Sequence, residues 1–237
     1  MNHMTLFERM RRFIVEGHYC QGDPLPPEPV LQKQFECSRA SLREALKQLE
    51  TLDLVQIRRG VGTFVGPLGV APLLDALASS AIIRSRTNPE AFLDLLEVRI
   101  ALDVGLAERV CGAYAGSETP ELDVIVKEMM AAAERDEDIT EHDKHFHQVM
   151  LSVLNNSFAE DLVANFWTVF QTIGLYERSH LKIGRLEIAR SHRDLVQAAR
   201  AGDVQRYVHA IHVHYRGSRE QAQLLSRRGD RLSAADQ

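Results

Sequence analysis

The chain has 237 residues, with 28 Lys and Arg against 33 Asp and Glu, which gives a formal net charge of −5. With 45% hydrophobic and 26% charged residues, it is neither disordered nor fibrous, and its length allows one or two domains. No apolar run approaches the ~18 residues that a membrane helix needs, and the N-terminus lacks a signal-peptide pattern. Cys20, Cys37 and Cys111 form no CxxC pair. We therefore expect no disulfide framework, no thiolate zinc site and a cytoplasmic location.

The N-terminal part of the chain predicts three helices followed by a small hairpin. Apolar residues at helical spacing indicate a helix over Met4–Glu16 and, after a break rich in Gly and Pro, a short helix over Glu28–Phe35. Ser38 is a suitable N-cap for a third helix that runs to about Thr51. Two β-like runs, separated by a turn rich in Gly and Arg, follow within Leu54–Val65. This order of elements is typical of a winged helix-turn-helix.

The domain boundaries follow from these patterns. We assign residues 1–66 to the winged helix-turn-helix domain, 67–72 to a linker, 73–230 to an all-helical domain and 231–237 to a disordered tail. Helical periodicity covers Leu73–Ser85, Glu90–Ala113, Pro120–Glu134, Glu141–Leu154, Phe158–His180, Ile188–Ala201 and Asp203–Ser226. Because the loops between these helices are short, we expect an antiparallel bundle. The predicted fold class is mainly α: a winged helix-turn-helix with a small β-hairpin wing, then an all-α helical bundle.

Polar residues gather at the N-terminal end of the third helix, in the run SRASLR that starts at Ser38. A recognition helix carries its base-reading side chains at this end, because this end enters the major groove. Arg39 and Arg43 are four residues apart and project from the same side of the helix. Arginine there can contact a guanine edge or clamp a phosphate. The alternative is an ordinary solvated helix face, with Arg43 paired to Glu36 or Lys47 paired to Glu50.

The turn between the two β-like runs contains Arg58, Arg59 and Gly60. Such a turn is a suitable wing tip for contact with phosphate or with the minor groove. Residues 1–66 hold nine Lys or Arg against eight Asp or Glu, whereas the rest of the chain carries a net charge of −6. An acidic protein can still bind nucleic acid when its basic residues gather on one face.

Histidine is concentrated in the helical domain, where eight of the ten histidines lie. Asp143 and His147, four residues apart, share one helix face, a spacing at which a carboxylate and an imidazole can bind one metal ion. His192 and His214 lie ten and twelve residues on either side of Gly202. If Gly202 forms the turn of a helical hairpin, the two histidines are level on adjacent helices. One Asp and three His suit Zn²⁺, Ni²⁺ or Mn²⁺.

A lone histidine on a helix is more often a surface or core residue than a ligand. We expect this ordinary role for His142, His145, His209 and His212. His180 has two interpretations, because it could face the site or cap the C-terminus of its helix. The metal hypothesis for the other four residues depends on the helix pairing.

The segment Leu25–Val65 resembles the N-terminal domain of GntR-type bacterial transcriptional regulators. The shared elements are the LP-x-E start, the SR-x-x-x-RE-A-L core and the G-x-G-T-F-V wing. The resemblance implies that Arg39, Ser41, Arg43 and Gly60 contact operator DNA.

Two positions depart from the family pattern. Pro29 stands where Arg usually follows the Glu of the LP-x-E start, so a DNA-backbone contact made there in relatives is absent or replaced by Lys33. Asp53 stands where Gly is common before the wing.

Residues from about 73 to 226 resemble the FCD effector domain of the FadR-type branch of the GntR family. The matching segments are Leu96–Val110, Asp143–Asn156 and Ser191–His214. In metal-binding members of this branch, a D-x-x-x-H pair and two later histidines hold a divalent cation. The resemblance places these ligands at Asp143, His147, His192 and His214.

The same resemblance assigns Arg99 to an arginine that points at the effector carboxylate. The alternative for Arg99 is an ion pair with Asp103, four residues further along the helix. Asp103 replaces the Glu that is more common at its position in the family. The sequence therefore does not define the shape of the effector pocket.

These features predict a homodimeric, ligand-responsive transcription factor that is not an enzyme. It would bind a palindromic operator in double-stranded DNA and, in its helical domain, a small carboxylate metabolite beside a divalent metal ion. We expect Zn²⁺ first, with Ni²⁺ or Mn²⁺ as alternatives, and a repressor released by its ligand, as in most family members. One rival is a metal-sensing regulator, in which the cation is the signal. Another is a metal-dependent hydrolase, which would leave the winged helix unexplained and has no obvious general base beside the ligands.

Overall fold

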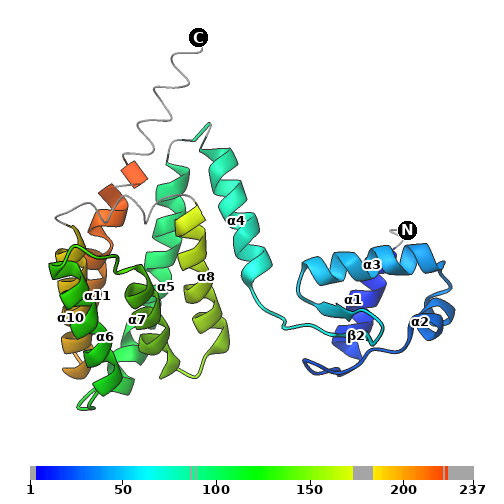
Figure 1. Cartoon of the computed structure of the whole chain (residues 1–237), viewed down its shortest axis with the longest axis horizontal. Helices are drawn as coiled ribbons and strands as arrows, with labels where there is room; N and C mark the ends of the chain where they lie inside the picture. Colours follow the sequence, from blue (N-terminus) through cyan, green and yellow to red (C-terminus); the bar gives the residue numbers. More distant parts are fainter. Residues whose placement is uncertain (1–3, 86, 89, 173–183, 221, 224–237) are drawn as a thin grey trace, which may run out of the picture. The chain divides into compact units, whose positions relative to one another are not determined.

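The structure of the chain is a computed structural model that describes residues 4–85, 87–88, 90–172, 184–220 and 222–223 (Figure 1). The chain divides into two compact units, Met1–Leu73 and Leu74–Gln237. The division falls just beyond the linker expected at residues 67–72, and the tail expected at 231–237 lies outside the described residues. Within the described part of the chain, the helices are too short or too polar to span a bilayer.

The N-terminal unit is built from three helices and one hairpin. The helices are α1 (Leu6–Glu16), α2 (Glu28–Phe35) and α3 (Arg39–Thr51), and the strands are β1 (Val55–Arg58) and β2 (Gly62–Val65). α3 packs against α1, α2 and β1. The apolar faces of these elements form one core, made of Met10, Ile14, Leu25, Leu31, Phe35, Leu42, Ala45, Leu46, Leu49, Val55 and Val65. The predicted winged helix-turn-helix is confirmed.

Side-chain caps determine where two of these helices begin. In α1, the Thr5 hydroxyl accepts from the Glu8 backbone N–H, and the Glu8 carboxylate accepts from the Thr5 backbone N–H. At the start of α3, the Ser38 hydroxyl accepts from the Ser41 backbone N–H at 3.1 Å. Between these helices, α2 ends at Glu36 in the left-handed region, with a φ of 50°. The chain therefore turns sharply from α2 into α3, which produces the helix-turn-helix pair.

Two residues with positive φ angles shape the ends of the wing. β1 and β2 pair antiparallel, and the Val61 N–H donates to the Arg58 carbonyl at 3.0 Å to close the turn between them. Gly60 in this turn has a φ of 75°, a conformation that favours glycine. Asp53, just before β1, has a φ of 57°. The left-handed backbone at Asp53 is a physical reason for the glycine that is common at this position in the family.

A third extended segment pairs with the wing and was not foreseen from the sequence. Pro24 pairs with Phe64 of β2, and the Leu25 N–H donates to the Thr63 carbonyl at 2.8 Å. The proline-rich entry to α2 is therefore attached to β2. This contact places the beginning of α2 next to the hairpin.

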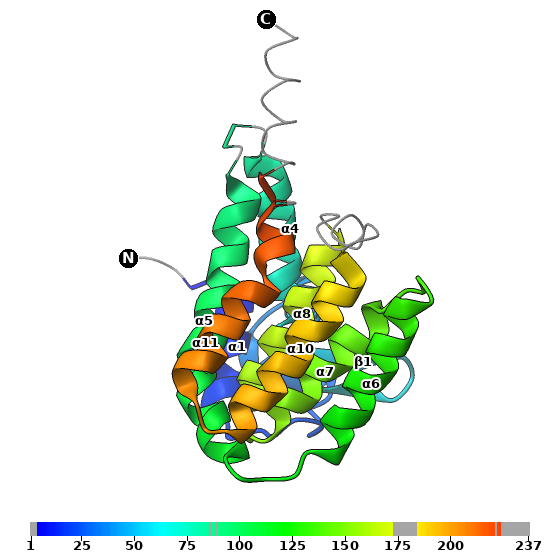
Figure 2. The same ribbon diagram turned by 90° about the vertical axis from the view of Figure 1, so that its left-hand side faces the viewer.

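The second unit is helical in its described residues. It contains α4 (Ala71–Arg84, which crosses the division), α5 (Ala91–Tyr114), α6 (Pro120–Glu134), α7 (Thr140–Ser152), α8 (Ser157–Thr172), α10 (Gly184–Arg200) and α11 (Val204–His214). α10 packs against α5, α6 and α11, and α7 packs against α6 and α8 (Figure 2). The predicted all-helical bundle is confirmed.

Helix ends differ from the prediction in two places. α10 already includes residues 184–187, before the expected start at Ile188. The helix expected from residue 203 to 226 ends at His214; Tyr215 interrupts it, and residues 216–220 are again helical. The predicted end of the helix that contains α8, at His180, lies outside the described residues.

Candidate DNA-reading surface and metal centre

The recognition helix α3 exposes the two arginines that the sequence singled out. The side chains of Arg39 and Arg43 are 67% and 54% exposed and lie one helical turn apart. Ser41 is also exposed, whereas the hydroxyl of Ser38 is engaged as the helix cap. The structure therefore gives Ser38 a role in starting α3. Its contact with DNA stays a prediction.

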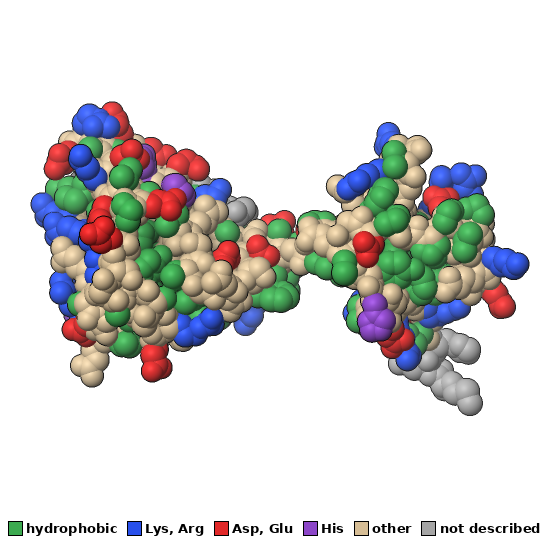
Figure 3. Space-filling view, turned by 90° about the horizontal axis from the view of Figure 1, so that it is seen from below, with side chains coloured by type: hydrophobic (Ala, Val, Ile, Leu, Met, Phe, Trp, Pro, Cys, Tyr) green, Lys and Arg blue, Asp and Glu red, His purple; other side chains and the backbone are tan. Residues whose placement is uncertain are grey.

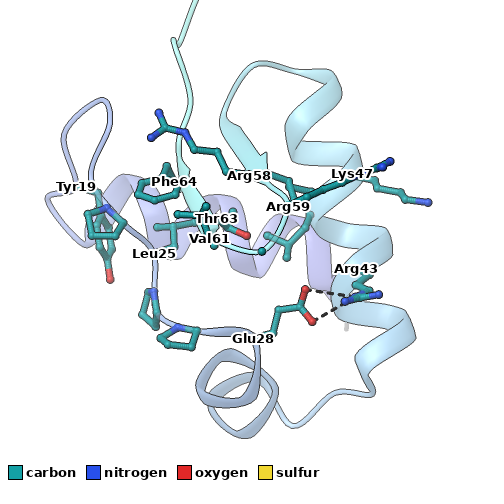
Figure 4. A pocket seen from close by; sticks show the side chains of 17 residues that line it. Tyr19, Leu25, Glu28, Arg43, Lys47, Arg58, Arg59, Val61, Thr63 and Phe64 are labelled. Atoms are coloured by element: carbon teal, nitrogen blue, oxygen red, sulfur yellow. Dashed lines mark hydrogen bonds and ion pairs between the residues drawn. The ribbon is translucent and has the colours of Figure 1, made fainter.

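Both arginines face one carboxylate, that of Glu28 in the first turn of α2 (Figure 4). Arg43 donates from Nε to the two carboxylate oxygens at 3.3 and 3.2 Å. The Nε atom of Arg39 lies 3.6 Å from Oε2 of the same carboxylate. The alternative pairing of Arg43 with Glu36 is therefore wrong: Glu28 lies closer because the turn after α2 brings the start of α2 against α3.

The wing carries its arginines in different environments. The guanidinium carbon of Arg58 lies 4.3 Å from the ring centroid of Phe64, and its Nε donates to Gln56 at 3.0 Å. This stacking and this hydrogen bond restrain Arg58 on the surface of the hairpin. Arg58 is exposed, and so are Arg59 and Gly60 at the tip of the turn. The tip is therefore accessible to a partner.

A groove of about 1010 Å³ separates α3 from the wing (Figure 4). Arg43 and Lys47 line it from α3, and Arg58 and Arg59 line it from the wing. Figure 3 shows Lys and Arg side chains projecting from the outer edges of this unit, with acidic side chains between them. Cations on both walls of one groove suit a polyanion such as a DNA backbone.

The four predicted ligand residues meet in the interior of the helical unit. Asp143 and His147 come from α7, His192 from α10 and His214 from α11, and all four are buried. One donor atom from each lies within 4.8 Å of the others. Asp143 Oδ1 lies 3.0 Å from His192 Nε2 and 3.2 Å from His147 Nε2. The Nε2 atoms of His147 and His214 are 3.2 Å apart.

The turn at Gly202 brings His192 and His214 together. Gly202 has a φ of 65°, and α10 and α11 pack against each other on either side of it. The ring centroids of His192 and His214 are 4.5 Å apart. The helical hairpin expected from the sequence is therefore present, and it places His192 and His214 next to each other.

Hydrogen bonds on the far side of two rings determine which nitrogen is available to a metal. His192 Nδ1 lies 2.8 Å from the Ile188 carbonyl, which only accepts, so Nδ1 carries a proton and Nε2 is the nitrogen that faces Asp143 and would face a metal ion. The Ser191 hydroxyl donates to the same carbonyl at 2.7 Å and lies 3.1 Å from His214 Nδ1. His214 Nδ1 therefore donates to Ser191, and in the neutral ring its Nε2 is unprotonated. The donor set fits a divalent cation.

Electrostatics favour the protonation states that a metal ion requires. Burial opposes the charged form of Asp143, but the charge of His192 and hydrogen bonds from His147 and His192 hold the pKa of this carboxyl well below its ordinary value. Burial lowers the pKa of His147. Burial, then repulsion from His192 and His147, lowers the pKa of His214 further. An ionised carboxylate and neutral imidazoles are the forms that bind metal ions.

Arg99 lies in α5 and is 2% exposed. Its Nε donates to both carboxylate oxygens of Asp103 at 3.3 and 3.2 Å, and its Nη1 donates to the Val163 carbonyl at 3.0 Å. The Tyr215 hydroxyl donates to the same aspartate at 2.7 Å. The ion pair that we considered as the alternative for Arg99 is therefore present. The role of Arg99 in effector binding stays a prediction.

A small cavity lies beside the four donors. Asp103, His147, His214 and Tyr215 are among its lining residues, and its volume is about 10 Å³. This is room for about one water molecule. Arg99 is not among the described residues that line it. A larger ligand would have to displace side chains here.

The remaining described histidines lie away from this cluster. His145, His209 and His212 are exposed and His142 is half-buried, in keeping with the ordinary role expected for them. His145 lies 3.9 Å from the carboxylate of Glu121 on α6. His180 lies outside the described residues.

Sequence reasoning missed two residues of these sites. Glu28 was noted as part of the LP-x-E start but not as the partner of the recognition arginines. Ser191 was passed over because a serine next to a histidine carries no signal by itself. Only the packing of α2 against α3, and of α10 against α11, gives these two side chains their roles.

Comparison with known families accounts for both units. The profile of the bacterial regulatory proteins of the gntR family matches residues 3–65, and that of the FCD domain matches residues 94–217, more than half of the chain. The chain belongs to the GntR family. It carries the DNA-binding domain of the gntR regulators followed by an FCD domain, which confirms the family predicted from the sequence motifs.

Related regulators are about a quarter identical to this chain over the aligned residues. The GntR protein is 27% identical over 149 residues to the galactonate operon transcriptional repressor of Escherichia coli, and 26% identical over 151 residues to the HTH-type transcriptional regulator LutR of Bacillus subtilis. Both alignments cover 63% of this chain, and the chain spans about two thirds of the length of these relatives, 65% and 67%. The solved Streptococcus agalactiae GntR structure matches with a TM-score of 0.58 at 23% identity, covering 90% of this chain and 97% of that one. This likeness supports the shared fold.

Proposed function

We propose that this regulator is a homodimeric repressor whose DNA binding is controlled by a small carboxylate metabolite bound beside a divalent metal ion. The observation that carries the proposal is the buried set of Asp143, His147, His192 and His214, whose donor atoms lie within 4.8 Å of one another inside the FCD domain. Burying a carboxylate and three imidazoles costs free energy of folding, which apolar side chains at the same positions would not cost. A bound cation would offset this cost by its attraction to the carboxylate and the imidazole nitrogens.

Three imidazole nitrogens and one carboxylate oxygen are borderline ligands that suit Zn²⁺, with Ni²⁺ or Mn²⁺ as alternatives. When bound, such a cation acts as a Lewis acid that attracts an anionic ligand. Within the protein, Ile188 and Ser191 hold the rings of His192 and His214 in the orientation that presents Nε2. The protein thus supplies a pre-oriented site in which little side-chain entropy is lost on metal binding.

A small carboxylate is the ligand class that fits this centre best. One relative is named as the repressor of the galactonate operon, and galactonate is a hydroxy acid. A carboxylate that displaced side chains around the small cavity lined by Asp103 and Tyr215 would lie beside the centre. Arg99, which pairs with Asp103, would serve as the second anchor once the ligand carboxylate competes for its guanidinium.

The DNA half of the proposal uses the exposed cations of the N-terminal unit. Arg39, Ser41 and Arg43 of α3 would enter the major groove, and Arg58, Arg59 and Gly60 of the wing would contact phosphate or the minor groove. One such module reads one half-site, so a palindromic operator requires two chains related by a two-fold axis. Such a protein acts where the genome lies, in the bacterial cytoplasm.

Thermal unfolding in the presence of candidate ligands tests the proposal. Small hydroxy-, keto- and dicarboxylic acids, including sugar acids, are screened with Zn²⁺ and with a chelator. An effector at 100 times its dissociation constant should stabilise the protein by about 2.7 kcal/mol, and only when metal is present. The same acid should release the protein from a DNA duplex selected from a random pool. If no acid stabilises the metal-loaded protein, the effector part of the proposal is wrong.

Two variants assign roles within this experiment. His214→Ala should lose the metal, measured by elemental analysis, whereas His212→Ala, two residues away on the exposed side of α11, should keep it. Arg99→Lys keeps the charge but loses the planar fork, so it should retain the metal and weaken the acid-induced stabilisation. A wild-type protein that can never be loaded with a divalent ion would make the cluster purely structural.

A metal-sensing regulator is the second candidate, favoured by the small volume of the cavity, about 10 Å³. In that case the cation itself would change the affinity for DNA. Titration of Zn²⁺ or Ni²⁺ into chelator-treated protein, with DNA binding as the readout and no organic acid present, distinguishes the two functions.

A further inference from the structure

The contacts of Glu28 with the two recognition arginines are asymmetric. Among the described residues, both contacts use the Nε side of the guanidinium: Arg43 donates from Nε at 3.2 and 3.3 Å, and Arg39 Nε lies 3.6 Å away. Within the same described part of the chain, the Nη atoms of these two arginines donate no hydrogen bond to protein. The terminal forks of both side chains are therefore available to a ligand.

Glu28 follows an anchored stretch of backbone, and its side chain is less exposed than the two arginines that it contacts. Glu28 begins α2, directly after Pro26 and Pro27, and its side chain is 30% exposed. The preceding Leu25 is attached to β2 through its N–H at 2.8 Å from the Thr63 carbonyl. The arginines are long side chains that are more than half exposed. Such side chains lose considerable rotamer freedom when they bind, unless a fixed partner restrains them beforehand.

We propose that Glu28 is a positioning residue of the DNA-reading surface, which holds Arg39 and Arg43 from the Nε side so that their Nη forks face a base edge. Guanine O6 and N7 are read by two donors of one arginine in a fixed geometry. Restraint by Glu28 favours this readout, which depends on orientation. Contact with phosphate depends mainly on charge, and the negative charge of Glu28 weakens it.

This inference rests on the proposed assignment of Arg39 and Arg43 to DNA recognition. It gives Glu28 opposite effects on two kinds of binding. Removing its charge without changing its size, as in Glu28→Gln, releases the arginines and adds one unit of positive charge to the groove. Specific binding should weaken because the forks are no longer oriented. Binding to any phosphate backbone should stay the same or strengthen.

The test compares two DNA duplexes at one salt concentration. One duplex is selected by the wild-type full-length protein from a random pool, and the other is its shuffled version with equal length and base composition. Glu28→Gln should reduce the ratio of the two affinities by about tenfold or more, the scale of one bidentate base contact. Thermal unfolding confirms that each variant is folded.

Glu44→Gln is the matched control. Glu44 is an exposed carboxylate on α3 whose hydrogen-bond partner among the described residues is Gln48, at 3.5 Å. The change in charge is the same, so Glu44→Gln should shift both affinities by one common factor and leave their ratio unchanged. If Glu28→Gln behaves like Glu44→Gln, or changes neither affinity, Glu28 forms an ordinary surface ion pair and the inference is overturned.

A second background separates this inference from the function on which it rests. In a protein that carries Arg39→Ala and Arg43→Ala, the further change Glu28→Gln should no longer alter the ratio of affinities. If the double arginine variant binds the selected duplex as tightly as wild type, the recognition assignment itself is wrong. If it loses specificity while Glu28→Gln keeps it, only the positioning role of Glu28 is refuted.

Discussion

At the scale of single residues, the buried cluster depends on hydrogen bonds that reach its imidazoles from behind. The Ser191 hydroxyl accepts from His214 Nδ1 and donates to the Ile188 carbonyl, so it fixes both the tautomer and the orientation of that ring. Residues with this role commonly contribute 10–100-fold to metal affinity. Ser191 contacts His214 at Nδ1 and not at Nε2, but by binding Nδ1 it determines where Nε2 points and whether Nε2 carries a proton.

We expect Ser191→Ala to weaken Zn²⁺ binding by about 10–100-fold, measured by competition with a chromophoric chelator. The ring of His214 would rotate more freely and could protonate at Nε2. Ser152→Ala is the control, because the Ser152 hydroxyl makes a similar bond to a backbone carbonyl, that of Val149 at 2.9 Å, at an exposed position of α7. Equal metal affinity in the two variants would contradict a positioning role for Ser191.

The buried histidines also predict how the metal-free protein responds to pH. Burial lowers the pKa of His147 and His214 below the value they have in the unfolded chain, about 6.5. As the pH falls below that value, the unfolded chain takes up protons that the folded chain does not, so stability is lost. Asp143, whose pKa is lowered, stays ionised in both states down to about pH 5 and adds little to this window.

Urea unfolding of chelator-treated protein should therefore show lower stability at pH 5.5 than at pH 7. Each histidine can contribute up to about 1.4 kcal/mol per pH unit. His214→Gln, which keeps a polar side chain but does not titrate, should show a smaller loss over the same range. A stability that is constant or rises from pH 7 to pH 5.5 would falsify this account.

At the scale of elements, the beginning of the recognition helix is set by one hydroxyl. Ser38 caps α3 through the Ser41 N–H. Ser38→Ala should lower the free energy of unfolding of the protein by about 1 kcal/mol, because a backbone donor loses its acceptor. Ser38→Asp should restore that stability, since a carboxylate is a good cap near the positive end of the helix dipole.

DNA binding separates the two variants of Ser38. Ser38→Asp places a negative charge next to the DNA-reading surface, so it should bind any duplex more weakly than wild type although it is equally stable. If Ser38→Ala were as stable as wild type in chemical unfolding, the cap would be irrelevant to the stability of α3.

Local sequence signals predicted some elements better than others. The starts expected for α2 and α3 agree with the structure because Pro27 and Ser38 give local signals for helix starts. The start of α10 and the pairing of Pro24 with β2 were missed. Pairing between segments distant in sequence depends on the tertiary packing around them. Hydrophobic periodicity and secondary-structure propensity are local properties and do not report this packing.

At the scale of the whole molecule, the DNA-reading unit implies an assembly. A palindromic site requires two recognition helices with a fixed spacing, and a single chain supplies one α3. We expect a dimer by light scattering at micromolar concentration, both with and without DNA. A monomer under both conditions would contradict the proposed operator geometry. Arg43→Ala should leave the dimer intact while weakening DNA binding, because α3 exposes this side chain.

The sequence by itself determined the protein family, the order of its helices and the four residues of the buried Asp/His cluster. These features are encoded locally, in helical periodicity, in capping residues, in family motifs and in the spacing of His192 and His214 about Gly202. The tertiary structure decided the rest. It placed Glu28 against the recognition arginines, Ser191 behind His214 and Asp103 beside Arg99. The first two contacts join separate helices, so side-chain packing determines them; the third lies within α5, where the sequence offered an ion pair only as an alternative.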